Sequence, residues 1–484
     1  ASPDHPRAIR YVARNRPGQA QRQGLPNRPS GRLQRLDANR HALWRADGPC
    51  HCQDATLSER RAGSPRLLGF SMNRHQRVVK RVSPGDSALA SRLTNEIEGD
   101  VLFDPFSRGR YSTDASIYQI EPIGVVIPRT EADVIRTIQV AAEEGVPVLP
   151  RGAGTSQCGQ SVGEALIIDF SKHLDQTIAF DQDARTVTVQ PGLVLDDLNR
   201  GLKPSGLYFP VDVSTASQAT IGGMTGNNSC GARSIRYGNM VHNVRSIQAV
   251  TSDGAILEFG EVPGNFGTLG GSGRYSDLLQ ALRQLAREAA VSEDPRWPKL
   301  LRRVGGYNID SISDEGHNMA HMLVGSEGTL AAFTRIELEL QPIPAHKVLG
   351  VCHFPTFYSA MDATQHIVEL QPTAVELVDR TMIDLSKEIP LYTATIDQFV
   401  RGQPEALLLV EFAGEEQQAQ HNRLGELVDL MGSLGFPNSV VRATEPELQT
   451  AIWKVRKAGL NIMMSMKGDG KPVSFIEDCA VALE

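Results

Sequence analysis

The residues that first suggest chemistry are the arginine and glycines of VLPRGAGTSQCGQSVGEALIIDF, residues 148–170. Two apolar runs flank a loop of small residues, and glycines let successive backbone N–H groups surround an anion such as a phosphate. The loop lacks GxGxxG and a Walker lysine, and it is too short for the helix of the usual dinucleotide-binding βαβ unit. It therefore predicts an anion held by amides between two strands, with Arg151 as the candidate counter-charge. A tight turn with glycines at positive φ is the alternative.

Two further stretches strengthen the binding interpretation. STASQATIGGMTGNNSCGARSIRYGN, residues 214–239, contains five glycines and three asparagines and is predicted to be a long non-repetitive segment. Such segments in compact domains are usually functional, and this composition suits backbone wrapped around a polar ligand. LVGSEGTLAAF, residues 323–333, is predicted to place small residues and one acid at the end of a strand. Three such segments converging on one extended ligand indicate a dinucleotide.

The elements that must position these segments follow an α/β pattern. TEADVIRTIQVAAEEG predicts a helix with Thr130 as its N-cap, Val134, Ile138 and Ala141 on its apolar face, and Gly145 as its stop. A second helix is predicted in VLDDLNRGLKPSG, and a hairpin in TIAFDQDARTVTVQPG. Strands are predicted in IGVVIP, VPVLP, ALIIDF, SIQAVT, AILEF and IELELQP. QPIPAHK, residues 341–347, is a plausible domain boundary, after which VLGVCHF opens a second domain.

Composition and charge exclude several classes of protein. The 484 residues suffice for two or three domains, and no apolar run approaches the roughly 18 residues that span a bilayer. The six cysteines form no CxxC pair, which indicates neither a disulfide framework nor a zinc site and fits a reducing compartment. The whole chain carries −7, but residues 1–71, with 13 Arg, no Lys and five acids, carry +8, which leaves −15 on the remainder. This excludes a basic nucleic-acid footprint on the folded part.

Residues 1–71 differ from the rest of the chain. They are rich in Pro, Gly, Gln and Arg and show no helical or strand period, so they are predicted to be disordered. A start site assigned too early is the favoured explanation, because Met72 opens the well-patterned sequence. An organelle transit peptide and a nucleic-acid-binding arm are the alternatives.

Four ordered motifs, PRGAGTS, PGLVLDDLN, ATIGGMTGNNSCGARSIRYG and GSEGTLA, resemble flavoproteins of the vanillyl-alcohol oxidase type. The resemblance lies in the branch of D-lactate, glycolate and D-2-hydroxyglutarate dehydrogenases. FDPFSRGRYSTDASIY and GDGKPVSFIEDCAV further resemble the large bacterial FAD and iron–sulfur D-2-hydroxyglutarate dehydrogenase-like proteins. The resemblance implies an α+β and α/β fold: a lead-in segment over residues 72–117, a two-subdomain PCMH-type FAD-binding domain over 118–342, and an α+β substrate cap over 345–484.

The resemblance also implies which residues bind FAD. The pyrophosphate loop would comprise Arg151, Gly152, Ala153, Gly154, Thr155 and Ser156, with Gln160 and Ser161. The segment toward the flavin would comprise Ser214, Ile221, Gly222, Gly223, Thr225, Asn228 and Gly231, with Glu327 and Gly328 beside it. Covalent members of the wider family often attach FAD through a histidine in the pyrophosphate loop. Because Thr155 and Ser156 stand in that region here, non-covalent FAD is expected.

In the cap, the resemblance implies a substrate site of two cations. Arg456 in LQTAIWKVRKAGLNIMMSM and Lys471 in GDGKPVSF match the arginine and lysine that bind substrate carboxylates in hydroxyglutarate-type enzymes. A planar guanidinium recognises a carboxylate through two hydrogen bonds, and a lysine adds a point charge. A solvated helix face with a snorkelling arginine is the alternative.

The sequence departs from the family pattern in one respect. The family's metal-binding and proton-abstracting histidines follow the lysine, whereas this sequence stops at Glu484 and has no iron–sulfur cysteine run. His317 and His321 have helical spacing but no HExxH glutamate, so no metal site is predicted in this chain. We expect a fragment with the complete flavin domain, part of the cap and little turnover. A divalent metal and an iron–sulfur cluster are expected only in a full-length protein.

The activity implied is oxidation of a D-2-hydroxy acid, of the D-2-hydroxyglutarate or D-lactate type, by hydride transfer to flavin N5. A non-catalytic flavin-binding module, or a transferase or reductase on the same fold, is the alternative. The partners implied are a small 2-hydroxy acid and an electron acceptor that the sequence does not identify, with no nucleic acid and no transmembrane segment. A cytoplasmic location is expected, with attachment to the periphery of the inner membrane as the alternative.

Overall fold

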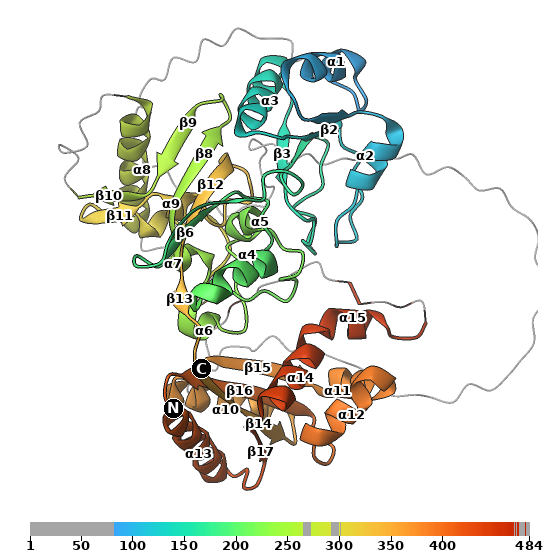
Figure 1. Cartoon of the computed structure of the whole chain (residues 1–484), viewed down its shortest axis with the longest axis vertical. Helices are drawn as coiled ribbons and strands as arrows, with labels where there is room; N and C mark the ends of the chain where they lie inside the picture. Colours follow the sequence, from blue (N-terminus) through green and yellow to red (C-terminus); the bar gives the residue numbers. More distant parts are fainter. Residues whose placement is uncertain are drawn as a thin grey trace, which may run out of the picture. The chain divides into compact units, whose positions relative to one another are not determined.

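The computed structural model describes residues 82–264, 273–291, 300, 302–468, 470, 472–473 and 480 (Figure 1). The predictions for residues 1–71 and for Lys471 lie outside the described residues. Within these ranges no helix is long and apolar enough to cross a membrane.

The first sheet has four strands in the order β1-β2-β4-β3. β2, β4 and β3 are parallel, and β1 pairs antiparallel with β2. β2 and β4 are buried at every position, as continuous apolar runs in a covered sheet should be. The elements of this layer are α1 (Ser87–Glu96), β1 (Asp100–Leu102), α2 (Pro105–Tyr111), β2 (Gly124–Ile127), α3 (Glu131–Glu144), β3 (Val148–Arg151) and β4 (Leu166–Asp169).

Helix α3 confirms the predicted start and stop signals. The Thr130 side chain accepts from the backbone N–H of Asp133, and the Asp133 side chain accepts from the backbone N–H of Thr130, which forms a capping box. Gly145 ends the helix in the left-handed region at φ 67°. Val134 and Ile138 on the predicted apolar face are buried and help fix α3 against β4.

The second sheet has five antiparallel strands in the order β5-β6-β12-β8-β9. β5 and β6 confirm the predicted hairpin, whose turn places Arg185 at φ 53°. The largest hydrophobic core lies against this sheet, where α4 packs its buried leucines. The strands and helices are β5 (Thr177–Asp181), β6 (Thr186–Val189), α4 (Leu195–Leu202), β8 (Val244–Thr251), β9 (Ile256–Phe259), α8 (Arg274–Val291), α9 (Ala320–Leu323) and β12 (Ala331–Glu339).

Smaller elements complete residues 82–342, called the flavin-side domain below because the sequence predicts that they bind FAD. They are the 3-10 helices η1 (Lys203–Ser205) and η3 (Ile309–Ser311), the pair β7 (Leu207–Tyr208) and β13 (Gln341–Pro342), and the pair β10 (Glu261–Pro263) and β11 (Gly316–Asn318).

Two predictions about the glycine-rich segments were wrong in their local structure. Residues 214–239, together with Met240–Asn243, contain three short helices, α5 (Ile221–Asn227), α6 (Ser234–Tyr237) and α7 (Met240–Asn243), rather than a wholly irregular chain. Thr220 caps α5 and Asn228 ends it in the left-handed region, so polar residues that suggest a loop act as helix caps. Residues 323–333 run from the end of the helical turn α9 into the start of β12, rather than ending a strand.

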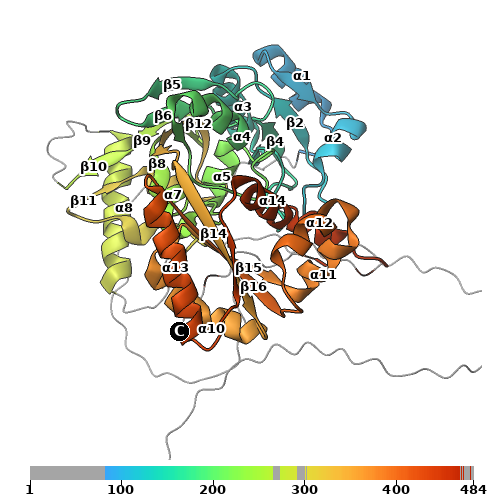
Figure 2. The same cartoon turned by 60° about the horizontal axis from the view of Figure 1, so that its bottom comes forward.

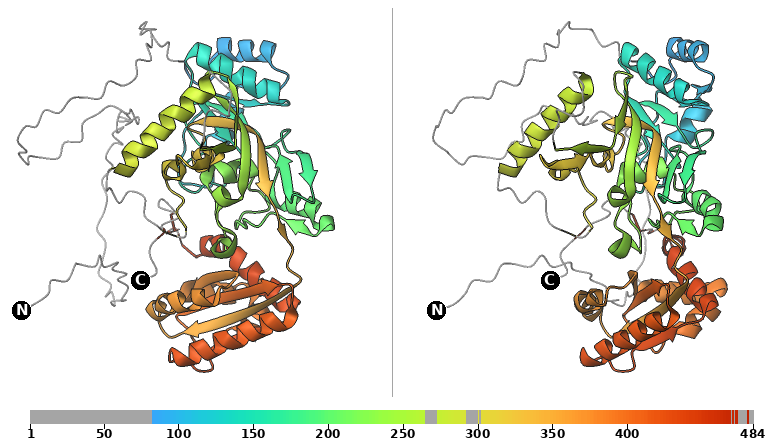
Figure 3. Two further views of the ribbon diagram at one scale, coloured as in Figure 1. Left: turned by 90° about the vertical axis from the view of Figure 1, so that its left-hand side faces the viewer. Right: turned by 60° about the vertical axis from the view of Figure 1, so that its left-hand side comes forward.

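The cap domain is an antiparallel sheet in the order β15-β16-β14-β17, with helices on both faces (Figures 2 and 3). α10 and α13 pack on one face, and α11, α12 and α14 pack on the other, because alternate residues of β14 and β16 enter two separate hydrophobic cores. The chain passes from β13 into β14 between Pro342 and His346.

The elements of the cap are β14 (His346–Phe354), α10 (Phe357–Ile367), η4 (Val368–Leu370), β15 (Ala374–Asp379), α11 (Arg380–Glu388), α12 (Pro390–Phe399), β16 (Ala406–Gly414), α13 (Gln417–Ser433), β17 (Val440–Ala443), α14 (Pro446–Lys457) and α15 (Gly459–Met464). The predicted helix around Arg456 is thus interrupted at Ala458, between α14 and α15.

Candidate active site

One cavity of about 960 Å³ brings the three glycine-rich segments together with the cap. It is lined by the first loop (residues 151–165), by the second segment (residues 214–239), by the third segment (residues 323–333) and by α14. A cavity of this size suits a cofactor together with a small substrate.

The first loop lies directly against the start of α5. A Cβ atom on Gly152 would lie 2.2 Å from Oγ1 of Thr220, which no real contact allows. The same Oγ1 accepts the backbone N–H of Gly223 at 3.3 Å and caps α5. Glycine at 152 is therefore required for the first loop to approach the cap of α5.

The third segment is tied to α5 from the other side. The backbone N–H of Gly325 donates to the carbonyl of Thr225 at 3.0 Å, and that of Glu327 donates to the carbonyl of Gly226 at 2.9 Å. Glu327 and Gly328 adopt left-handed conformations at φ 51° and 71°. These bonds use carbonyls at the end of α5 and hold the third segment at the cavity wall.

The first loop offers a set of hydrogen-bond donors to the cavity. Among the described residues, the six backbone N–H groups of residues 152–157 donate to no protein acceptor, although all six residues line the cavity. Consecutive amides without acceptors in the protein are groups that can bind an anion. A pyrophosphate needs donors of this kind, and its binding by this loop stays a prediction.

Arg151 has a different set of partners from the one predicted. Its NH1 group donates to the carbonyls of Tyr111 and Ser161, each at 3.0 Å, and its NH2 group donates to the carbonyl of Thr113 at 2.7 Å. The guanidinium also lies 5.3 Å from the centre of the Tyr111 ring. Burial lowers the pKa of Arg151. The side chain thus fixes the first loop, and its role as the counter-charge of the anion stays a prediction.

Most of the predicted cofactor residues line the cavity. Those that do are Arg151, Gly152, Ala153, Gly154, Thr155, Ser156, Gln160, Ser161, Ser214, Gly222, Gly223, Gly231, Glu327 and Gly328. Ile221, Thr225 and Asn228 do not line it and are buried behind it. Thr225 Oγ1 donates to the carbonyl of Ile221 within α5, and Asn228 Oδ1 accepts the backbone N–H of Val241, so these residues support the wall.

Arg456 of α14 also lines the cavity, next to a carboxylate. Its NH2 group donates to Oε2 of Glu376 on β15, whereas its Nε is buried without a partner among the described residues. Trp453, one turn earlier on α14, and Lys457 line the same cavity. The cap side therefore presents two cations, one already paired, beside an indole ring.

A second cavity of about 920 Å³ adjoins the first and shares Gly231, Ala232, Arg302 and Glu376 with it.

His317 and His321 do not share a helix face, because His317 belongs to β11 and His321 to α9. In the described ranges no group of three or more His, Cys, Asp or Glu residues is placed to hold a metal ion.

Sequence reasoning missed four residues of this site. Thr220 and Asp212 gave no signal in the sequence. The role of Thr220 depends on its contact with Gly152, and that of Asp212 on its bonds to the backbone and side chain of Arg233. Glu376 is brought to Arg456 only by the packing of α14 against the sheet. Lys457 was the one residue with a signal, since it follows Arg456 directly.

Comparisons with known proteins match both domains of the chain. A model of the FAD binding domain matches residues 122–260, and a model of the C-terminal domain of FAD linked oxidases matches residues 343–484. The chain is 32% identical to D-2-hydroxyglutarate dehydrogenase of Escherichia coli strain K12, over 83% of this chain and 42% of that protein. It is 26% identical to a glycolate oxidase subunit of Bacillus subtilis strain 168, over 80% of this chain and 71% of that protein.

The fold has a counterpart among solved structures. Alkyldihydroxyacetonephosphate synthase superposes with a TM-score of 0.57 at 18% identity, over 78% of this chain and 63% of that one, which shows a shared fold. The chain spans about 40% of the length of the D-2-hydroxyglutarate dehydrogenases that it matches. With an FAD binding domain followed by the C-terminal domain of FAD linked oxidases, the chain belongs to the PCMH-type, FAD-linked oxidase family.

Proposed function

We propose that the cavity binds FAD without a covalent bond, and that the protein oxidises a D-2-hydroxy acid of the D-2-hydroxyglutarate or D-lactate type. The observation that carries the proposal is the meeting, in one cavity, of Arg456 and Lys457 with six amides that have no acceptor in the described part of the chain. Amides suit a pyrophosphate, and cations suit a carboxylate. Several relatives bear the name D-2-hydroxyglutarate dehydrogenase, and others D-lactate dehydrogenase.

The first loop would hold the pyrophosphate through residues 152–157, while the second segment would run along the rest of the cofactor. Gly222 sets the position of α5 at the cavity wall, because a Cβ there would lie 2.5 Å from Cβ of Pro191, so α5 needs a glycine to lie this close to the neighbouring turn. When bound, FAD supplies a two-electron acceptor for the hydride of the substrate.

The cap would bind and orient the substrate. Arg456 offers the substrate carboxylate those donors that Glu376 does not use, and Lys457 adds a second positive charge. The Trp453 side chain lines the cavity beside them, and with substrate bound it would keep water from this side of both ionic contacts and so strengthen them.

The proposal is tested in two stages. The purified chain is loaded with FAD, and binding is followed by flavin fluorescence. D-2-Hydroxyglutarate, D-lactate and L-lactate are then added without oxygen while the flavin absorbance is recorded. We expect FAD to bind and the D-acids to perturb its spectrum more than L-lactate does. Bleaching by a D-acid reports the oxidation itself.

Arg456→Gln is the critical variant, and Arg442→Gln on β17, which does not line the cavity, is its matched control. We expect Arg456→Gln to weaken binding of the D-acid by about tenfold or more while FAD binding is unchanged, because a charge-assisted bond contributes about 1.5–3 kcal/mol. If no 2-hydroxy acid changes or bleaches the flavin absorbance, the result favours a flavin-binding module without this activity. Failure to bind FAD would refute the proposal altogether.

A further inference from the structure

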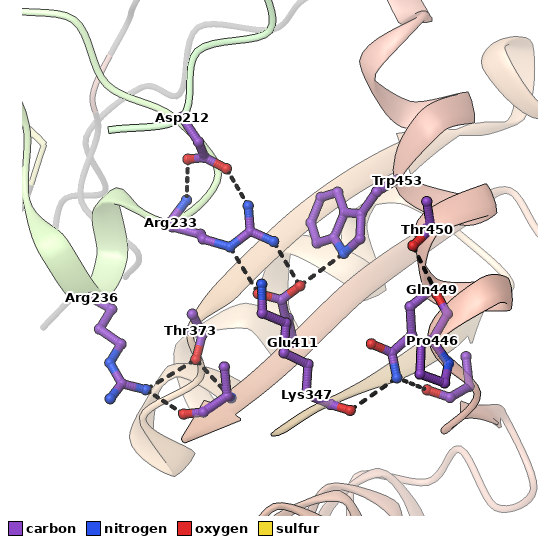
Figure 4. Close-up of polar contacts among 12 residues, drawn as sticks. Asp212, Arg233, Arg236, Lys347, Thr373, Glu411, Pro446, Gln449, Thr450 and Trp453 are labelled. Carbon is purple, nitrogen blue, oxygen red and sulfur yellow. Dashed lines mark hydrogen bonds and ion pairs between the residues drawn. The ribbon is translucent and has the colours of Figure 1, made fainter. Parts of the chain in front are cut away.

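Glu411, a buried carboxylate outside the cavity, connects the flavin-side domain to the cap. It lies on β16 with 1% exposure and accepts from Nε and NH2 of Arg233 at 2.9 and 2.8 Å (Figure 4). The same carboxylate accepts the indole N–H of Trp453 at 2.9 Å. One side chain therefore joins the second segment to α14, the helix that carries Arg456.

Arg233 is fixed from its own domain as well. Its NH1 group and its backbone N–H donate to the two carboxylate oxygens of Asp212, at 2.5 and 3.0 Å. Its guanidinium also lies 5.3 Å from the centre of the Trp453 ring. Burial lowers the pKa of Arg233, but the charges of Glu411 and Asp212 outweigh burial and raise it, so the guanidinium remains a cation.

Two members of this network reach the cavity. Asp212 and Trp453 line it, and Trp453 precedes Arg456 by three residues, so both side chains lie on the same face of α14. The orientation of the indole ring is fixed by its bond to Glu411 and by the guanidinium beside it. Any change at Glu411 thus reaches the wall that a substrate would contact.

We infer that Glu411 is a positioning residue for the substrate site: it holds Trp453, and through α14 Arg456, at a fixed place relative to the flavin-side wall. The inference rests on the proposed function, because it takes Arg456 as the group that receives the substrate carboxylate. A carboxylate bound by three strong donors in a buried place has one preferred geometry, which suits a positioning role.

A second bridge between the same elements provides the control. NH1 of Arg236 in α6 donates to the carbonyl of Ala413 on β16 at 2.7 Å and to Oγ1 of Thr373 at 3.2 Å, without touching α14. A merely structural network would make Glu411 and Arg236 equivalent, because each joins the second segment to the cap. A positioning role makes them different in substrate binding.

The experiment compares Glu411→Gln, Trp453→Phe and Arg236→Gln in the FAD-loaded chain, with D-2-hydroxyglutarate as the probe. We expect the first two variants to raise the dissociation constant of the probe about tenfold, the scale of one charge-assisted hydrogen bond, with FAD affinity unchanged. Arg236→Gln should leave both affinities near those of the wild type. Trp453→Phe removes the indole N–H that Glu411 accepts and leaves a smaller aromatic ring at the cavity wall, so it breaks the same bond from the other side if Glu411→Gln does not fold.

The outcomes separate the two proposals. A wild-type chain that binds FAD but does not respond to the probe refutes the proposed function, whatever the variants do. A responsive wild type with equal probe affinities in all three variants removes Glu411 from substrate positioning and leaves it a structural contact. Loss of FAD affinity in Glu411→Gln and Trp453→Phe would also overturn the inference, because the network would then act on the cofactor.

Discussion

Replacing Gly152 with alanine tests the contact that brings the first loop to α5. The new Cβ would lie 2.2 Å from Oγ1 of Thr220, far inside any normal contact, so either the loop or the helix cap must move. Overpacking of this kind costs about 1–3 kcal/mol. If the loop moves, its amides leave the cavity wall, and we expect the affinity for FAD to fall roughly 5- to 150-fold.

Gly163 in the same loop is the matched control, because a Cβ there would lie 3.6 Å from the Leu149 side chain, an ordinary contact. A double variant adds Thr220→Ala to Gly152→Ala. It removes the clashing oxygen, and the remaining Cβ of residue 220 would lie 3.4 Å away. We expect it to recover most of the lost affinity, less the cost of about 1 kcal/mol for an absent N-cap.

The assay is titration of flavin fluorescence for each variant, with urea unfolding to separate folding from binding. Unchanged FAD affinity in Gly152→Ala, or equal losses in Gly152→Ala and Gly163→Ala, would refute the reasoning. A double variant that binds no better than Gly152→Ala would show that the Thr220 oxygen is not the obstacle.

Three further predictions concern the cofactor, pH and backbone. Acid precipitation should release all flavin into the supernatant; flavin in the pellet would contradict non-covalent binding and direct attention to Cys158 and Cys230, which line the cavity. Burial lowers the pKa of His353 below its usual value near 6.5, and its Nε2 accepts the backbone N–H of Arg401, so the folded state holds it neutral. The unfolded chain therefore binds more protons than the folded one below pH 6.5. The contribution of neutral His353 to stability is complete above pH 6.5 and is lost as the pH falls through the folded pKa. As the pH falls below 6.5, the melting temperature of His353→Gln should decrease less steeply than that of the wild type. An identical slope in both proteins would exclude this role of His353. Asn228→Ala should lower the free energy of unfolding by about 1–3 kcal/mol, because alanine is strained at φ 52° and the Val241 N–H loses its acceptor; urea midpoints equal to wild type would contradict this.

The sequence predicts those parts of the fold that depend on local signals. Thr130 and Gly145 delimit α3, and the alternation around Asp181 and Arg185 predicts the β5–β6 hairpin, because each signal lies within a few residues of its effect. The three segments that line the cavity are predicted from their glycines and from the family resemblance. Their internal structure was not, since Thr220 and Asn228 suit loops and helix caps equally well.

The ionic pairs within the cap, and between the cap and the second segment, could not be predicted for a different reason. Glu376 and Arg456 are 80 residues apart in sequence, and Arg233 and Glu411 are 178 apart, so only the tertiary packing selects these pairs. Composition marks all four merely as charged residues. The prediction that Arg456 binds a substrate carboxylate therefore omitted the carboxylate already beside it.

The pairing of β1 with β2 bears on how the flavin-side domain can be handled in isolation. The match to the FAD binding domain begins at residue 122, after β1, whereas β1 covers the outer edge of β2, a strand buried at all four positions. A recombinant domain trimmed to the match would expose an apolar strand with unpaired N–H and C=O groups, which is a template for edge-to-edge aggregation. Residues 82–121 are thus a solubility element of the domain, and a soluble flavin domain should be expressed with them.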